Sequence, residues 1–391
     1  MENKIKPEII EPRLVERFMR YTAVCTTSDR HNAGTPSTAG QWELARLLVS
    51  ELEALGLEAE LTDRCYVLSS IPPSAGREAL PAVGFLAHLD TSEDVSGENV
   101  RARIAVRDGI RVIESSGDTL LGADDKAGIA EIMSAAEYVL EHPEIRHPKI
   151  EIVFSPDEET GKGLPEFPME KISGKYYYTV DGGAAAEIEM ECFNAYAASV
   201  MFKGRVIHPG EARGKLVNAA AMASYFVTLL PRNESPEATD GYYGYYYVTN
   251  IEGNHAGAKV ELLLRDFEKD GIERRLEALE AFAGAVDAAF PGGETKIETH
   301  ESYLNMKKKI DSFPLAAKKL YEAAEETGIT LKKKPIRGGT DGARLTELGI
   351  PTPNIFTGGR NFHSREEYVS IDDMVLSVRF IVNLIKAWSS S

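Results

Sequence analysis

Short apolar runs alternate with helical patterns over most of this 391-residue chain, and this alternation constrains the fold more than any other feature. The runs at 82–87, 149–155 and 176–180 have the length and composition of buried strands, and a short strand is expected near 352–356. Helical spacing of apolar residues predicts helices at 13–21, 39–55, 126–140, 313–327 and 371–388. Strands that alternate with helices predict an α/β domain with a mostly parallel central sheet flanked by helices.

The pattern changes near residue 195 and returns after about residue 305. Between these points we expect, in order, a strand at 195–204, a helix at 218–230, a tyrosine-rich stretch at 242–248, a strand at 258–266 and a long helix at 271–290. This β-α-β-β-α order predicts a smaller α+β, ferredoxin-like sandwich of one sheet and two helices. We therefore expect a domain at 198–304, inserted into a first domain that consists of 1–197 and 305–391.

Composition disfavours several classes of partner. Hydrophobic residues make up 43% of the chain, which is enough for a sizeable core. With 44 basic and 61 acidic residues the net charge is −17, whereas a duplex DNA or anionic membrane partner requires a basic surface. The three cysteines, Cys25, Cys65 and Cys192, form no CxxC pair and indicate a reducing compartment. We see no signal peptide in the charged N-terminus and no membrane span, so a cytoplasmic protein is expected.

Polar residues follow the apolar strands at several places, and ligands of open α/β sheets bind at the carboxyl ends of strands. The first motif is His88-Leu89-Asp90, directly after the run at 82–87. A well-oriented zinc-binding histidine needs its second ring nitrogen held by a carboxylate or carbonyl, and Asp90 is placed to hold it. The alternative interpretation of this motif is an ordinary polar strand end.

The next two motifs are richer in acids. Asp124 and Asp125 stand in a glycine-flanked loop at a helix start, where they would act as N-caps or bridge two metals. Asp157, Glu158 and Glu159 follow the second buried run. Such a run of acids is usually a solvated cluster, but after an inward-pointing strand a cation would stabilise it. One glutamate would then bind metal while the other moves protons.

The last two motifs are Asp181, at the end of the third run, and His363, in a glycine-rich loop. Taken alone, they are typical of a turn aspartate and a surface histidine. Jointly, however, the five motifs supply two histidines and at least three carboxylates on strand ends. Such a set suits zinc, and sometimes cobalt or manganese, and two metals that share a bridging carboxylate need about this inventory.

The order of these motifs, HxD, GADDKAG, DEETG, DGG and a late NFH, resembles the aminoacylase-like di-zinc metallopeptidases. Further blocks resemble the tripeptide aminopeptidase branch of that family: RFMRY at 17–21, TPSTAGQW at 35–42, HPG at 208–210 and RGGTDG at 337–342. The matches run from about residue 16 to residue 383. The resemblance implies a hydrolase that removes the N-terminal residue of short peptides, chiefly tripeptides, by means of a hydroxide that bridges two zinc ions.

The resemblance also implies a ligand set. His88 and Asp181 would bind one metal ion, Glu159 and His363 would bind the other, and Asp124 would bridge the two. The cofactors would be two Zn²⁺ per subunit, with Co²⁺ or Mn²⁺ as substitutes.

Further roles follow from the same resemblance. Asp90 would orient His88, and Glu158 would be the general base. His208, in the inserted domain, would reach across the interface of a homodimer and stabilise the oxyanion in the partner's site. Arg337 would bind the carboxylate end of the peptide, and Asn218 would add a substrate contact.

Two alternatives stay open. A related di-zinc carboxypeptidase or N-acyl amino acid hydrolase would keep the metals and change the pocket, and a non-catalytic metal-binding or peptide-binding protein would keep only the fold. The N-terminal and RGGTDG blocks favour the aminopeptidase. The sequence departs from that branch at Arg360, where a histidine is typical, at Ser364-Arg365 after the expected ligand, and at the tyrosine-rich insert 235–247. The departures at Arg360 and Ser364-Arg365 leave the preferred peptide length open, and the insert would alter the lid or the dimer interface.

Overall fold

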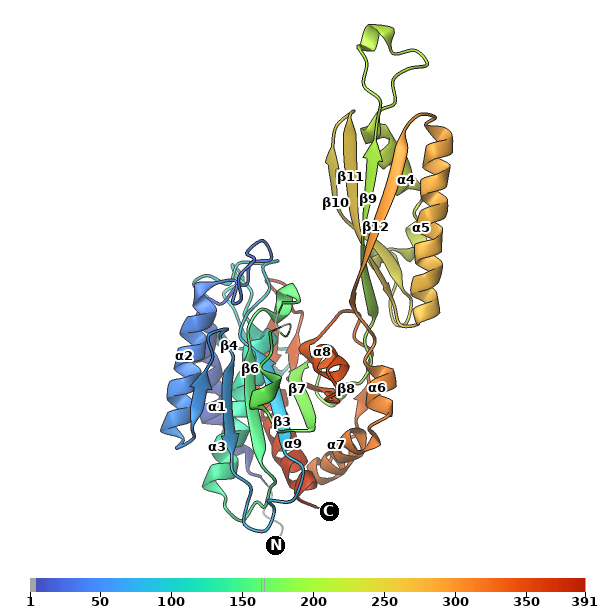
Figure 1. Ribbon diagram of the computed structural model, residues 1–391. Coiled ribbons are helices and arrows are strands. Elements are labelled where there is room, and N and C mark those ends of the chain that lie inside the picture. Colours follow the sequence, from blue (N-terminus) through green and yellow to red (C-terminus); the bar gives the residue numbers. More distant parts are fainter. Residues whose placement is uncertain (1–4, 163, 165, 391) are drawn as a thin grey trace. The chain divides into compact units, whose positions relative to one another are not determined.

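The computed structural model describes residues 5–162, 164 and 166–390, which divide into two units. The second unit consists of Glu191–Asn305 and Pro335–Gly339, and the first contains the rest of the chain (Figure 1). The sequence placed the first boundary at 197/198. In the structure this boundary lies nearer the N-terminus, at 190/191, because strand β9 (Asn194–Lys203) pairs along its whole length within the second unit. The segment 335–339, expected in the first domain, also belongs to the second unit.

An eight-stranded mixed sheet with the strand order β1-β2-β6-β3-β7-β14-β8-β13 forms the centre of the first unit. Its strands are β1 (Ala59–Leu61), β2 (Val67–Ile71), β3 (Val83–His88), β6 (Ile150–Ser155), β7 (Tyr176–Gly182), β8 (Glu187–Glu189), β13 (Lys332–Lys333) and β14 (Asn354–Phe356). The neighbours β6, β3, β7 and β14 are parallel, so their carboxyl ends lie at one edge of the sheet. The predicted α/β fold with a mostly parallel centre is confirmed.

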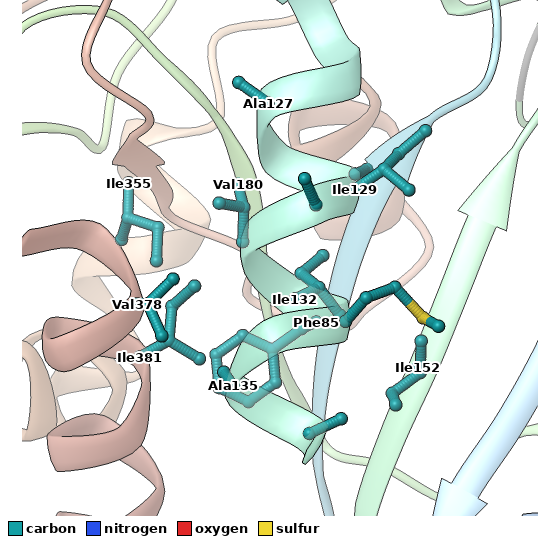
Figure 2. Close-up of a cluster of buried hydrophobic side chains, with 14 of the residues drawn as sticks. Phe85, Ala127, Ile129, Ile132, Ala135, Ile152, Val180, Ile355, Val378 and Ile381 are labelled. Carbon is teal, nitrogen blue, oxygen red and sulfur yellow. The ribbon is translucent and has the colours of Figure 1, made fainter. Parts of the chain in front are cut away.

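Helices of the first unit pack on this sheet and on one another with apolar side chains. They are α1 (Pro7–Thr22), α2 (Ala39–Ala54), α3 (Ala123–Glu141), α6 (Lys307–Asp311), α7 (Pro314–Thr327), α8 (Asp341–Glu347) and α9 (Ile371–Ser389). Helix α3 packs on β3 and β7, with α1 and α9 beside it. Figure 2 shows the resulting cluster, in which Ile132 of α3 gathers with Phe85, Val180 and Val378. Because burial of apolar surface drives folding, this core holds the strand ends in fixed positions.

A small antiparallel sheet with the order β15-β16-β5-β4 completes the first unit. Its strands are β4 (Arg103–Arg107), β5 (Ile110–Glu114), β15 (Gly359–Arg360) and β16 (Tyr368–Ser370). The sequence did not predict this sheet. Its strands are short and β4 is largely exposed, so they lack the apolar runs that marked the central strands. The loop between β15 and β16 carries His363.

The second unit is an antiparallel sheet with the order β10-β11-β9-β12 and two main helices. Its further elements are β10 (Tyr245–Gly253), β11 (Gly257–Asp266), β12 (Glu294–Tyr303), α4 (Ala219–Leu229) and α5 (Lys269–Ala289). Apolar side chains from both layers form its own core, among them Val200, Phe226 and Leu279. None of the helices in the described part of the chain is long and apolar enough to cross a membrane.

Candidate metal centre

Three neighbouring strands carry the candidate site at their carboxyl ends. His88 is the last residue of β3, Asp181 stands near the end of β7, and β6 leads into the loop with Glu158 and Glu159. Helix α3 begins at Ala123 and brings Asp124 to the same edge of the sheet. The parallel pairing of β6, β3 and β7 therefore explains why residues about 90 positions apart in sequence meet here.

Ligand-type atoms gather in two groups that share one residue. The first group is His88, Asp124 and Asp181, the second is Asp124, Glu159 and His363, and within each group the atoms lie within 4.8 Å of one another. Asp124 Oδ1 is 2.8 Å from His88 Nε2, and Asp124 Oδ2 is 3.4 Å from His363 Nε2. The two oxygens of one carboxylate thus face different histidines, which is the arrangement that a bridging ligand requires.

The charges in these groups are poorly balanced without a cation. Burial raises the pKa of Glu159 and of Asp181 to about 7, and the charge of Asp124 adds to the shift. Burial lowers the pKa of His88, but hydrogen bonds to Asp124, Asp181 and Asp90 outweigh it and hold that pKa well above its usual value. Burial also lowers the pKa of His363, but the negative charges of Asp124 and Glu159 outweigh it and raise that pKa to about 11. Three partly buried carboxyl groups therefore compete for two imidazole rings.

The donor set fits a pair of divalent cations. Glu159 Oε1 is buried and accepts no hydrogen bond from any described residue, although His363 Nε2 lies 2.9 Å away. Because a buried polar atom without a hydrogen bond is costly, a cation bound beside this oxygen would stabilise it. Two histidines with three carboxylates suit zinc, cobalt or manganese.

Asp90 is fully buried and joins two parts of the site. Its backbone oxygen lies 3.0 Å from His88 Nδ1 and its Oδ1 lies 3.3 Å from the same atom. Asp90 Oδ1 and Oδ2 also accept the backbone N–H groups of Glu158 and Glu159, at 3.0 and 3.2 Å. One residue therefore fixes both the histidine ring and the loop that carries the two glutamates.

Glu158 points to acid–base work. Burial raises its pKa well above the usual value, and neighbouring acids such as Asp181 and Asp341 add to the shift. A carboxyl group whose pKa is shifted towards neutrality can both accept and return a proton.

The third acid of that run, Asp157, holds the loop instead of facing the site. Asp157 Oδ2 accepts a hydrogen bond from the Ser37 N–H at 2.7 Å. Asp157 Oδ1 accepts hydrogen bonds from the Ser37 hydroxyl at 2.5 Å and from Gln41 Nε2 at 2.7 Å. Its own N–H donates to Gln41 Oε1 at 3.1 Å. The TPSTAGQW block near the N-terminus therefore supports the loop that carries Glu158 and Glu159.

Asp125 has a comparable supporting role beside Asp124. Its Oδ2 accepts the His88 N–H at 3.2 Å and its Oδ1 accepts the Gly128 N–H at 3.2 Å. The sequence left open whether the two aspartates cap the helix or bind metal. In the structure Asp124 faces the two histidines, and Asp125 caps the helix through the Gly128 N–H.

Two other sequence-predicted residues, His208 and Asn218, lie in the second unit. The exposed His208 ring accepts the Gly210 N–H at Nδ1, at 3.1 Å, so the neutral ring carries its proton on Nε2. Asn218 caps α4, because its side-chain oxygen accepts the N–H groups of Ala220 and Ala221 at 3.0 and 3.4 Å.

Arg337 also lies in the second unit, and its guanidinium group is already engaged there. It donates four hydrogen bonds of 2.7–3.2 Å to oxygen atoms of the segment 239–243. It also lies over the rings of Phe193 and Tyr245. A substrate carboxylate would have to displace some of these bonds before it could bind Arg337.

Three further acids close to the ligands escaped the sequence analysis. Asp94 Oδ2 lies 3.2 Å from His363 Nδ1, Asp341 Oδ2 accepts Ser155 Oγ at 2.5 Å, and Glu367 bonds to the loop of Asp124. Asp341 stands in the RGGTDG block, in which only Arg337 was predicted to have a role in the site. Glu367 stands four residues after His363, and its closeness in sequence to a predicted ligand is the feature that could have identified it.

Comparisons with known proteins agree with this geometry. Residues 85–387 match the peptidase family M20/M25/M40. A protein named peptidase T from Geobacillus thermodenitrificans is 42% identical to this chain, over 96% of this chain and 98% of that protein. The predicted resemblance is confirmed.

Solved structures show the same fold at lower identity. The aminopeptidase PepT from Bacillus cereus is 23% identical, covers 99% of this chain and 100% of its own, and has a TM-score of 0.80. A tripeptidase from Staphylococcus aureus is 20% identical with a TM-score of 0.83 and full coverage of both chains. A dinuclear metal binding peptidase of the M20 family from Bacillus subtilis is 14% identical, with a TM-score of 0.69 and coverage of 97% and 98%.

Proposed function

The chain belongs to the peptidase family M20/M25/M40, and on this premise we propose that it is a metal-dependent aminopeptidase that hydrolyses the N-terminal residue of short peptides, chiefly tripeptides. One observation carries the proposal: the two oxygens of Asp124 face two separate ligand groups at the carboxyl ends of the sheet. The names of the similar proteins, peptidase T, aminopeptidase and tripeptidase, support the class of substrate.

The proposed cofactors are two Zn²⁺ per subunit, with Co²⁺ or Mn²⁺ as substitutes. His88 and Asp181 would hold one ion, Glu159 and His363 would hold the other, and Asp124 would bridge them. When bound, the ions would lower the pKa of a water molecule and stabilise the negative charge that develops on the scissile carbonyl.

The protein's own groups supply the remaining chemistry. Glu158 would accept a proton from the attacking water and return it to the leaving amine. Asp90 places Glu158 through its backbone N–H. With Nδ1–H donated to Asp90, His88 keeps the lone pair on Nε2, which is the form that binds metal.

Residues of the second unit would complete the site. His208 would donate a hydrogen bond to the oxyanion in the partner subunit of a homodimer formed through this unit, and its Nε2 proton suits that role. Asn218 would add a substrate contact. Arg337 would bind the peptide carboxylate after it releases part of the segment 239–243.

We propose that the enzyme acts in the cytoplasm. In the described part of the chain Cys25, Cys65 and Cys192 form no disulfide, which fits a reducing compartment.

The test combines a peptide panel with metal analysis. Di-, tri- and tetrapeptides, N-acylated amino acids and carboxypeptidase substrates are assayed with the wild type and with Glu158→Ala, while bound metal is measured on the same samples. We expect tripeptides to lose their N-terminal residue fastest. Glu158→Ala should lower turnover by about 10²–10⁴-fold or more without loss of metal, since proton transfer is removed but no ligand is.

Glu170→Ala serves as the control, because Glu170 is an exposed acid of the first unit in the short 3-10 helix Met169–Lys171. Release of the C-terminal residue, or preference for an acylated amino acid, would replace the aminopeptidase proposal with the related carboxypeptidase or N-acyl amino acid hydrolase. Loss of metal in Glu158→Ala would make Glu158 a ligand.

A further inference from the structure

Glu367 is a buried carboxylate that binds the backbone of the Asp124 loop. Its side chain is 2% exposed. Glu367 Oε2 accepts the N–H groups of Leu121 and Gly122, both at 2.7 Å, and Glu367 Oε1 accepts the N–H of Asp124 at 3.1 Å. Gly122 has a φ of +80°, a conformation that favours glycine and curls the loop around the carboxylate.

These bonds act on the residue that both ligand groups share. Asp124 must present one oxygen to each group, so the direction of its side chain depends on the backbone between Leu121 and Asp124. Glu367 binds three N–H groups of that backbone. Burial raises the pKa of Glu367 to about 7, and when the group is ionised these bonds are stronger than those between neutral groups.

The loop between β15 and β16 carries both the candidate ligand His363 and the carboxylate of Glu367, which binds the loop of Asp124. His363 and Glu367 both lie between β15 and β16, and β16 pairs with β5. Glu367 thereby fixes the distance between the loops of His363 and Asp124, which belong to one ligand group. In the other group, His88 and Asp181 stand on central strands of the main sheet and depend less on this connection.

We propose that Glu367 is a positioning residue that holds Asp124 and His363 in register, so that the group formed by Asp124, Glu159 and His363 binds its metal ion tightly. The inference rests on the proposed function of the two groups as metal sites. Only a carboxylate meets the geometry, since three N–H donors converge on its two oxygens. A glutamine would place an N–H₂ group against one of them.

The experiment is a titration of the metal-free protein with Co²⁺, in which binding is monitored by calorimetry and by visible absorbance. It compares the wild type with Glu367→Gln, Glu367→Ala and the matched control Glu366→Gln, whose exposed side chain is adjacent in sequence. The wild type and the control should bind two ions per chain. In both Glu367 variants the ion held by Asp124, Glu159 and His363 should bind about 10–100-fold more weakly, whereas the ion held by His88, Asp124 and Asp181, which shares only Asp124 with that group, should be weakened much less.

General destabilisation would give a different result. It would weaken both ions equally, and that outcome, like two ions bound with wild-type affinity, would overturn the inference. Glu367→Gln is nearly isosteric and keeps one acceptor oxygen, so it remains decisive if Glu367→Ala does not fold. Circular dichroism of the metal-free variants checks folding.

The metal readout separates this inference from the proposed activity. If the wild type cleaves no peptide in the panel but the selective weakening of the ion held by Asp124, Glu159 and His363 is observed, the aminopeptidase proposal fails and the role of Glu367 stands. A wild type that binds fewer than two ions overturns the role of Glu367 as well.

Discussion

Glu151, on strand β6, is a single buried carboxylate that accepts hydrogen bonds from several groups at once. It is 3% exposed. Lys149 Nζ donates to it at 2.7 Å, Ser173 Oγ at 2.6 Å, the Gly174 N–H at 2.9 Å and the Tyr177 hydroxyl at 2.5 Å. Burial raises the pKa of Glu151, but these donors outweigh it and lower the pKa to about 2.

The pKa of Glu151 gives a pH-dependent contribution to stability. The folded-state pKa lies below the ordinary value of 4.5, so the stabilisation is present above about pH 4.5 and is lost as the pH falls towards 2. A shift of this size corresponds to about 3 kcal/mol. Glu151→Gln should therefore lower the free energy of unfolding of the metal-free protein by about 2–3 kcal/mol at pH 7, measured by urea denaturation.

The difference between wild type and Glu151→Gln should shrink as the pH falls from about 5 to 3. Glu53→Gln, at an exposed position, should show no such change. A difference that is the same at pH 7 and pH 3 would contradict the assignment.

Adjacent acids show where prediction from sequence ends at the residue scale. The motifs indicated that the acid runs line a metal site, because each run follows a buried strand or starts a helix. They did not indicate that Asp157 and Asp125 bind backbone and side-chain donors while their neighbours face the site. That choice depends on local backbone geometry, such as the positive φ of Asp157, and on partners that are distant in sequence, such as Ser37.

At the scale of elements, predictability follows burial. The apolar runs predicted β3, β6 and β7, since these strands are buried almost throughout. Strand β12 escaped because nearly all its side chains are at least partly exposed and its stability comes from pairing with β9. The predicted start of the helix at about residue 126 agrees with the dihedral angles, because α3 is bounded at Ala123 but Asp124 and Asp125 are not helical.

The segment 239–243 depends on one side chain from a distant part of the sequence, Arg337. Arg337→Ala should loosen this segment, because all four hydrogen bonds and the contacts with two rings are lost. We expect chymotrypsin to cleave near Tyr242 and Tyr243 about tenfold faster, which corresponds to about 1.4 kcal/mol of local opening free energy.

Arg274→Ala is the matched control, since Arg274 is exposed in the same unit and its nearest acid, Glu234, lies 3.8 Å away. An unchanged cleavage rate in Arg337→Ala would show that the segment is held by its other contacts, such as the Tyr242 hydroxyl with Glu191.

At the scale of the whole molecule, metal removal should act on one unit only. Both ligand groups found among the described residues lie in the first unit. Without cations their buried carboxylates repel one another, so bound metal stabilises the folded form of that unit. A free metal concentration 100 times the dissociation constant would contribute about 2.7 kcal/mol for each ion.

Differential scanning calorimetry with and without a chelator tests this expectation. The transition of the first unit should move to lower temperature on chelation and return when Zn²⁺ is added. The transition of the second unit should not move. Equal shifts of both transitions, or none, would argue against a metal pair confined to the first unit.

The position of β14 has a consequence for how the chain is made. This strand lies between β7 and β8 in the main sheet, although the whole second unit separates it from them in sequence. On the ribosome, the facing edges of β7 and β8 must therefore wait roughly 10–30 s for β14 at ordinary rates of synthesis. During that interval the second unit is synthesised while the sheet still has two open edges, and a chaperone that shields strand edges would act on them.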